Sequence, residues 1–163
     1  MDIKVCLGDI TTAKVDAIVN AANNLLQAGA GVCGAIFKAC NHFYELQGEC
    51  NKIGFCKTGE AVITNGYDLP AKYIIHTVGP VYRGDEDSVY LASAYKNSLI
   101  LADEKKLTSI AFPSISTGIY GYPLEKAVKI AVDTIKNYNP KNLKECYIYC
   151  FDERTYQYFK NEI

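Results

Sequence analysis

The chain has 163 residues, of which 49% are hydrophobic, so it can bury a full core and falls within the usual size of one domain. Its 17 basic and 18 acidic residues give a net charge of -1 and are spread along the chain. This balance excludes the basic stripe expected of a protein that binds a nucleic-acid backbone.

We therefore expect one domain over residues 1–163 that makes no direct contact with nucleic acid. No apolar run has the length of a membrane span, and the first residues, MDIKVCLGD, lack the pattern of a signal peptide. The expectation is a cytoplasmic protein that does not associate with a membrane. We also expect a monomer.

Seven cysteines are an odd number in a chain large enough to fold without disulfides, which favours reduced thiols. Cys40, His42, Cys50 and Cys56 raise the alternative of a zinc site. Their spacing lacks the paired C-x-x-C pattern of strong structural sites, so we expect no metal and no cofactor.

Short apolar runs predict buried strands at residues 3–7, 17–20, 60–64, 73–78, 109–112 and 146–151. Apolar residues at helical spacing lie between them, and one helix is expected to start near Cys33. One stripe contains Leu91, Tyr95, Ser98, Leu99 and Ala102, and the other contains Leu124, Ala127, Val128, Ala131 and Ile135. This alternation predicts an α/β fold with a largely parallel sheet, in which ligands bind beyond the carboxyl ends of the strands.

The first candidate motif is Gly8-Asp9-Ile10-Thr11, directly after the opening strand. A carboxylate at a strand end can accept a hydrogen bond from an exocyclic amine of a ligand. The structural alternative is a helix cap, because Asp and Thr side chains bind free backbone N–H groups.

The second motif, NAANNLLQAGAGVCG at residues 20–34, follows a predicted strand and precedes a helical run. Gly29, Gly31 and Gly34 permit close approach of the backbone, so successive N–H groups could hold a phosphate. The structural alternative is a surface loop without a ligand. The position between a strand and a helix favours phosphate binding.

The third motif, PSISTGIYGYP at residues 113–123, also follows a predicted strand and precedes a helix. Ser116, Thr117 and Gly118 offer a second anion cradle, and an aromatic ring such as Tyr120 could close over a sugar. The structural alternative is an ordinary turn with Pro123 at the start of the helix.

His76 lies inside the apolar run YIIHTV. Histidine is the usual acid or base near neutral pH, but this setting favours a hydrogen-bonded histidine in the core. We assign it no catalytic role.

The three motifs in this order, together with VDAIVNAAN and TGEAVITNGYDLPAKYIIHTVGP, resemble the macro domain family and its MacroD-type branch of ADP-ribosyl hydrolases. The resemblance covers nearly the whole chain. It implies a three-layer α/β/α sandwich with a mixed, mainly parallel central sheet.

The resemblance implies a binding site for ADP-ribose, and partners that are ADP-ribose or ADP-ribosylated proteins. Asp9 would bind the adenine amine with Ile10 against the ring, and Phe151, followed by Asp152, would pack near the adenine and its ribose. For Phe151 the structural alternative is core packing at a strand end. Asn23 would bind the distal ribose, with Asn20 supporting the loop from within. The residues that would flank the diphosphate and distal ribose are Gly29, Gly31, Val32, Gly34, Ser116, Thr117, Gly118, Ile119 and Tyr120.

The chain departs from the pattern of active MacroD-type hydrolases at Cys33, where the family carries an Asp ten residues after the ribose-binding Asn. A carboxylate can direct an attacking water, whereas a thiol is a poor hydrogen-bond acceptor, and such help is typically worth about 10² to 10⁴ in rate. Related macro domains that lack this Asp still hydrolyse, with a phosphate of the substrate positioning the water. An alternative is that Cys33, near a helix N-terminus, has a lowered pKa and acts as a nucleophile.

Two functions remain. The first is hydrolysis of mono-ADP-ribosyl esters on acidic protein side chains and of O-acetyl-ADP-ribose, with Asn23, Tyr120 and the Cys33 position as catalytic candidates. The second is an ADP-ribose reader without turnover. Cys33 favours the reader, and the 116–122 segment favours the enzyme.

Overall fold

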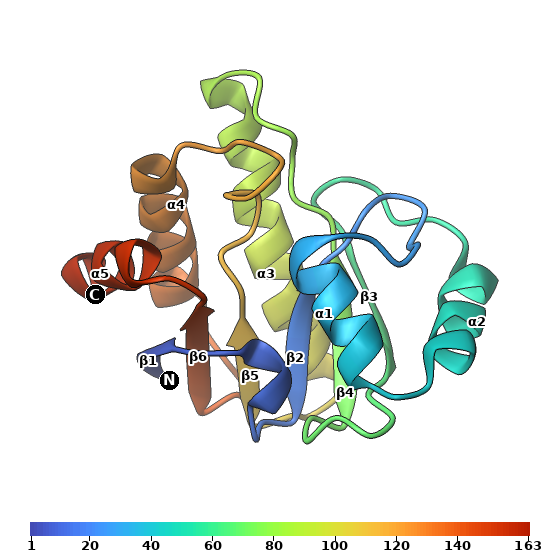
Figure 1. Cartoon of the computed structure of the whole chain (residues 1–163). Coiled ribbons are helices and arrows are strands. Elements are labelled where there is room, and N and C mark those ends of the chain that lie inside the picture. The colour runs from blue at the N-terminus through green and yellow to red at the C-terminus, as the bar shows by residue number, and fades with distance from the viewer.

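A computed structural model describes all 163 residues as a six-stranded sheet with helices on both faces (Figure 1). Each predicted strand is confirmed to within one residue at each end. The strands are β1 (Asp2–Leu7), β2 (Ala17–Ala21), β3 (Ala61–Asn65), β4 (Tyr73–Thr77), β5 (Ser109–Phe112) and β6 (Glu145–Cys150). The helices are α1 (Gly31–Ala39), α2 (Phe43–Ile53), α3 (Ser88–Glu104), α4 (Leu124–Asn137) and α5 (Glu153–Glu162).

The strand order is β1-β6-β5-β2-β4-β3. Every neighbouring pair is parallel except β3 and β4, which are antiparallel. The carboxyl ends of five strands therefore meet at one edge of the sheet, which we call the carboxyl edge. The predicted mixed, mainly parallel sheet is confirmed.

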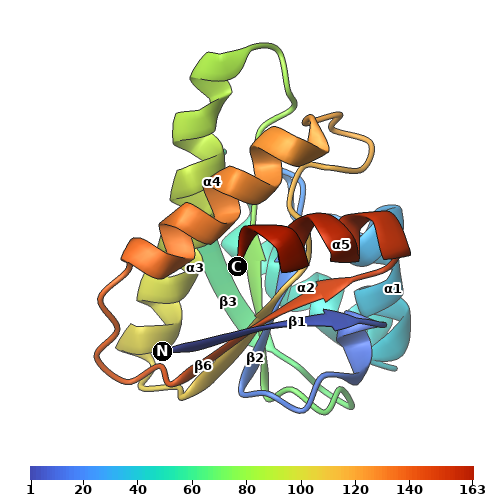
Figure 2. The same ribbon diagram turned by 90° about the vertical axis from the view of Figure 1, so that its left-hand side faces the viewer.

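Two hydrophobic cores lie on opposite faces of the sheet, and Figure 2 shows the sheet between α3 and α4 on one side and α1 and α2 on the other. The core under α3 and α4 includes Tyr95, Phe112 and the only buried residue of α5, Phe159. The core under α1 and α2 includes Ile36 and Leu46. Both predicted helical stripes face the first core, so the three-layer sandwich is confirmed. None of the helices has the length and apolar character needed to cross a membrane.

Helices α2 and α5 were not predicted from the sequence. Helix α2 buries only Leu46 and Cys50, and α5 buries only Phe159, so neither helix carries a long apolar stripe. Helix α2 ends at Gly54, whose φ of 83° is in the left-handed region that terminates helices.

A buried polar chain crosses the sheet beneath α1. Nδ2 of Asn20 lies 3.1 Å from Nδ1 of His76, and Nε2 of His76 lies 2.9 Å from Oγ1 of Thr64. Because the Asn20 amide is a donor here, Nδ1 accepts and the proton of the neutral ring sits on Nε2. Burial lowers the pKa of His76 to about 4, and the prediction of a hydrogen-bonded core histidine is confirmed.

The His76 environment predicts a pH-dependent stability. The folded pKa lies below the value of about 6.5 expected for the unfolded chain, so the unfolded state binds the proton first as the pH falls. The free energy of unfolding should decrease by about 3 kcal/mol between pH 6.5 and 4 through this group alone.

Urea unfolding at several pH values measures this decrease. His76→Gln should flatten it, because the variant lacks the buried imidazole. Equal slopes in the wild type and His76→Gln would contradict the assignment.

Candidate functional site

A groove with two connected lobes runs along the carboxyl edge of the sheet. The lobe beside the end of β6, here the β6 lobe, has a volume of about 640 Å³, and the lobe beside the end of β2, here the β2 lobe, has about 300 Å³. Both lobes are lined by Gly31, Val32, Ser114 and Gly118, so the groove is continuous. The β6 lobe adds Pro113, Thr117, Leu124, Tyr149, Cys150, Phe151, Asp152, Arg154 and Thr155, and the β2 lobe adds Ala21, Ala22, Asn23, Ala30, Ser116, Ile119 and Tyr120.

The N-terminus of α1 forms one wall of the groove. Its N-cap residue is Ala30, which makes no side-chain cap, so the first backbone N–H groups are open to an anionic ligand. Gly31 precedes them with a φ of 60°, a conformation that suits glycine. The predicted strand, loop and helix are confirmed, although α1 starts at Gly31 and not near Cys33.

Gly29 and Gly34, two glycines of the second motif, lie outside the groove. Gly34 is inside α1, and a Cβ on it would overlap with the carbonyl oxygen of Gly29. Gly34 therefore permits close packing of the loop on the helix. Neither residue lines a lobe of the groove, so their predicted contact with the diphosphate is not reproduced by this arrangement.

The loop of residues 113–123 forms the opposite wall. Ser116 has a φ of 67°, and its carbonyl oxygen accepts a hydrogen bond from the N–H of Tyr122 at 2.9 Å. The hydroxyl of Ser116 is buried without a hydrogen-bond partner. The N–H of Tyr82 donates to the carbonyl oxygen of Tyr120 at 2.9 Å, which ties the loop to the segment after β4.

The β6 lobe ends beside the first motif. The N–H of Gly8 donates to the carbonyl oxygen of Cys150 at 2.9 Å, which brings the first motif alongside the end of β6. Oδ1 of Asp9 accepts from both N and Oγ1 of Thr11, so the cap interpretation is confirmed, while Oδ2 makes no hydrogen bond in the structure. Asp9 does not line the lobe itself, and Ile10 is buried in the core.

Phe151 follows β6 and is 60% exposed on the wall of the β6 lobe. The alternative of core packing for this ring is therefore wrong. Asp152 caps α5 by accepting from the N–H of Thr155 at 2.7 Å, and this bond lowers the pKa of its carboxyl group. The strand, loop and helix pattern thus occurs a third time at this edge.

Asn23 lies on the wall of the β2 lobe, and both ends of its amide bind the backbone of one residue. Nδ2 donates to the carbonyl oxygen of Gln27 at 2.8 Å, and Oδ1 accepts from the N–H of Gln27 at 3.1 Å. Asn23 therefore holds the loop between β2 and α1, with one amide hydrogen left for a ligand.

Cys33 lies beneath the same loop and is 5% exposed. Its Sγ is 3.6 Å from both Nδ2 of Asn20 and the carbonyl oxygen of Gln27. Burial raises the pKa of the Cys33 thiol, and the residue lines neither lobe of the groove. The alternative of a lowered pKa at the helix N-terminus is wrong, because loss of solvent outweighs the nearby hydrogen bonds.

Asn20 is 1% exposed and also lies outside the groove, beneath the loop as expected. Sequence reasoning missed Arg154 and Thr155, which line the β6 lobe from the first turn of α5. The signal that could have found them is the strand, loop and helix pattern after β6, which matches the two recognised loops.

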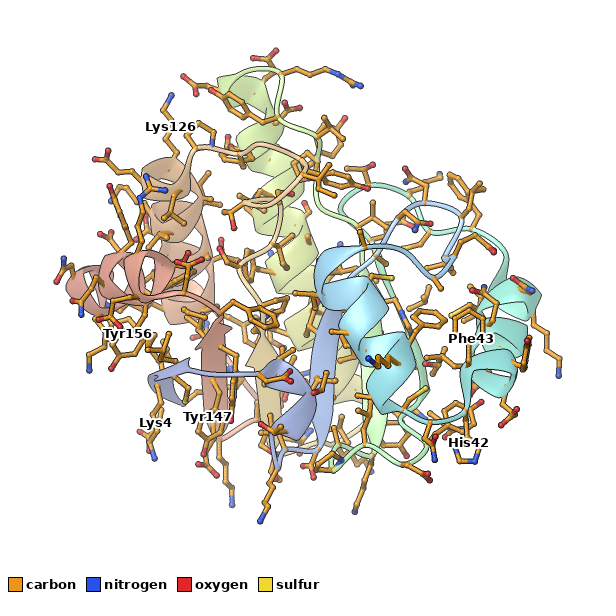
Figure 3. The ribbon with its side chains drawn as sticks, viewed as in Figure 1. Lys4, His42, Phe43, Lys126, Tyr147 and Tyr156 are labelled. Atoms are coloured by element: carbon orange, nitrogen blue, oxygen red, sulfur yellow. The ribbon has the colours of Figure 1, made fainter.

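A separate hollow lies on the outer side of the Gly-rich loop, between α1 and the start of α2. His42 and Phe43 line this hollow, and they lie on the opposite side of α1 from α4 and α5 (Figure 3). Cys40, Cys50 and Cys56 are buried in the core beneath it. They do not join His42 in any group of side chains that could hold a metal.

Comparison with known proteins agrees with this architecture. A family model described as "Macro domain" matches residues 19–131. An O-acetyl-ADP-ribose deacetylase of Klebsiella pneumoniae is 50% identical over 93% of this chain and 90% of its own. The human ADP-ribose glycohydrolase MACROD2 is 49% identical over 96% of this chain but only 38% of its own length.

A solved macrodomain of Trypanosoma brucei in complex with ADP-ribose is 39% identical and superposes with a TM-score of 0.88 over 98% of this chain and 68% of that chain. The family match covers more than half of the sequence, and the relatives and the fold agree with it. The chain belongs to the macro domain family.

Proposed function

We propose that this protein binds ADP-ribose in the two-lobed groove and hydrolyses mono-ADP-ribosyl esters on acidic protein side chains, and also O-acetyl-ADP-ribose. The observation that carries the proposal is the groove between the uncapped N-terminus of α1 and the 113–123 loop. A diphosphate needs donors on two sides, and these walls supply backbone N–H groups from both. The names of the deacetylase and glycohydrolase relatives support the same substrate class.

The two lobes suit the two ends of ADP-ribose. The adenosine end fits the larger β6 lobe, where Phe151 offers an exposed ring, and Asp9 follows the strand that pairs with β6. The distal ribose fits the β2 lobe, with Asn23 and Tyr120 on its wall. Gly31, Val32, Ser114 and Gly118 line the junction between the lobes, where the diphosphate would lie.

The proposed reaction is hydrolysis of an ester. For a modified carboxylate, water attacks C1 of the distal ribose, the C1–O bond breaks and the protein carboxylate leaves. The proton of the water passes to a phosphate oxygen of the substrate, so no side chain of the protein has to act as the base. The protein contributes orientation, through Asn23 and the two loops.

This scheme predicts a preference among linkages. A carboxylate, with a reference pKa near 4, is a far better leaving group than a guanidine, with a pKa above 12. Esters on Asp or Glu should therefore be cleaved in preference to linkages on Arg, which need strong acid catalysis.

The reader alternative is supported by Cys33. No carboxylate stands at this position, and the thiol is buried beneath the loop with a raised pKa. A reader would keep the groove and lose turnover.

A first prediction concerns Asp9. Asp9→Asn keeps an oxygen for the cap on Thr11 but replaces the second acceptor with a donor, which repels an adenine amine. Affinity for ADP-ribose should decrease about tenfold, the scale of one lost hydrogen bond, with little change in melting temperature. The inosine analogue, which carries a carbonyl in place of the amine, should gain affinity in the variant. Calorimetry with both ligands measures this, and unchanged selectivity would remove Asp9 from the site.

A second prediction concerns Asn23 and Cys33. Asn23→Ala should lower kcat about 100-fold or more while raising KM less, because orientation acts mainly on the transition state. Asn51→Ala is the matched control, since Asn51 binds the side chain of Gln27 outside the groove. Cys33→Ala should retain turnover, because the buried thiol neither lines the groove nor ionises readily.

Release of ADP-ribose from an automodified mono-ADP-ribosyltransferase decides between the enzyme and the reader. The wild type and Cys33→Ala are expected to release it at similar rates. Loss of turnover in Cys33→Ala alone would contradict the substrate-assisted scheme. A wild type without turnover that Cys33→Asp activates would make the native protein a reader.

A further inference from the structure

Gly79 lies two residues after the end of β4 and is buried. Its φ is outside the left-handed region, which among the glycines is adopted by Gly31, Gly54, Gly59 and Gly121. Any residue could therefore adopt the backbone conformation of Gly79. The requirement for glycine at this position must come from the space around it.

A side chain at Gly79 has no room. A Cβ built there would overlap with Oγ of Ser116 and would lie 2.5 Å from Cγ2 of Ile115. Both partners are enclosed, since Ser116 is 6% exposed and Ile115 is 1% exposed. Because Ile115 is enclosed on all sides, its Cγ2 cannot move away, and an added methyl group would displace the backbone of the 113–123 loop.

Ser116 is the residue at which a displacement matters most for the groove. It has a left-handed backbone with a φ of 67°, which residues other than glycine rarely adopt, so the surroundings must hold it there. The carbonyl oxygen of Ser116 binds the N–H of Tyr122, and the hydroxyl packs against Gly79 without a hydrogen-bond partner. Thr117 and Gly118, the next two residues, line the groove.

We propose that Gly79 is a positioning residue for the ligand groove. The missing side chain lets Ser116 pack against the end of β4, and this packing holds the left-handed turn that directs the backbone of Thr117 and Gly118 into the groove. The segment after β4 thus acts on ligand binding without touching the ligand. Only the choice of ADP-ribose as the probe rests on the proposed function.

Calorimetry with ADP-ribose tests the proposal. Gly79→Ala should weaken binding at least tenfold, because the displaced loop no longer directs the backbone of Thr117 and Gly118 into the groove. Gly48→Ala in α2, where a Cβ would meet no atom within 4 Å, is the matched control and should bind like the wild type. Wild-type affinity in Gly79→Ala would overturn the proposal.

A second substitution separates positioning from general damage. Ser116→Gly removes the closer of the two overlapping atoms and suits the left-handed backbone, although the contact with Ile115 stays, so Gly79→Ala/Ser116→Gly should recover part of the lost affinity. Additive losses in the double variant would overturn the proposal. If Gly79→Ala does not fold, the double variant must regain cooperative unfolding, and its failure to do so counts against the proposal equally.

Hydrogen exchange of the Tyr122 amide, which is protected by its hydrogen bond to the carbonyl oxygen of Ser116, provides a readout without ligand. Exchange should be faster in Gly79→Ala and return toward the wild-type rate in the double variant. Unchanged exchange in Gly79→Ala would overturn the positioning role, whatever affinity the calorimetry gives for that variant. A wild type that fails to bind ADP-ribose would instead refute the proposed function, while the exchange comparison still tests Gly79.

Discussion

The parallel pairing of β1, β6, β5, β2 and β4 is the constraint on which the site depends. Parallel strands end at the same edge, so the segments that follow β1, β2, β5 and β6 come together although they are far apart in the sequence. Three of these segments lead into a helix whose first turn lines the groove, at Gly31, Leu124 and Thr155. Backbone N–H groups can therefore bind a ligand anion in a protein whose net charge is only -1.

The loop between β2 and α1 is held from beneath by uncharged hydrogen bonds. Asn20 links His76 in the sheet to Cys33 in α1, and Cys33 reaches the carbonyl oxygen of Gln27, which also binds Asn23. Asn23, which is expected to contact the distal ribose, is thus connected to the buried polar chain through the carbonyl oxygen of Gln27. Because every member of this chain is neutral, the loop can be held without the cost of burying a charge.

The strands, the two long helical stripes and the three motifs at residues 8–11, 20–34 and 113–123 could be predicted from the sequence, because each has a local signature of period, glycine or proline. Helix α5 could not, since it buries only Phe159, and its Arg154 was missed with it. The direction in which a side chain points could not be predicted from the sequence either. Position alone made Cys33 a catalytic candidate, whereas the packing of the loop turns its thiol away from the groove.

The central claim is that the two loop walls of the carboxyl edge hold the diphosphate. Titration of ¹⁵N-labelled protein with ADP-ribose, followed through its amide resonances, tests this claim most directly. The account predicts saturable shifts concentrated at Gly31, Val32, Thr117 and Gly118, with none at Phe43 in the separate hollow beside α2. Shifts centred on Phe43, with the four groove amides unmoved, would contradict it.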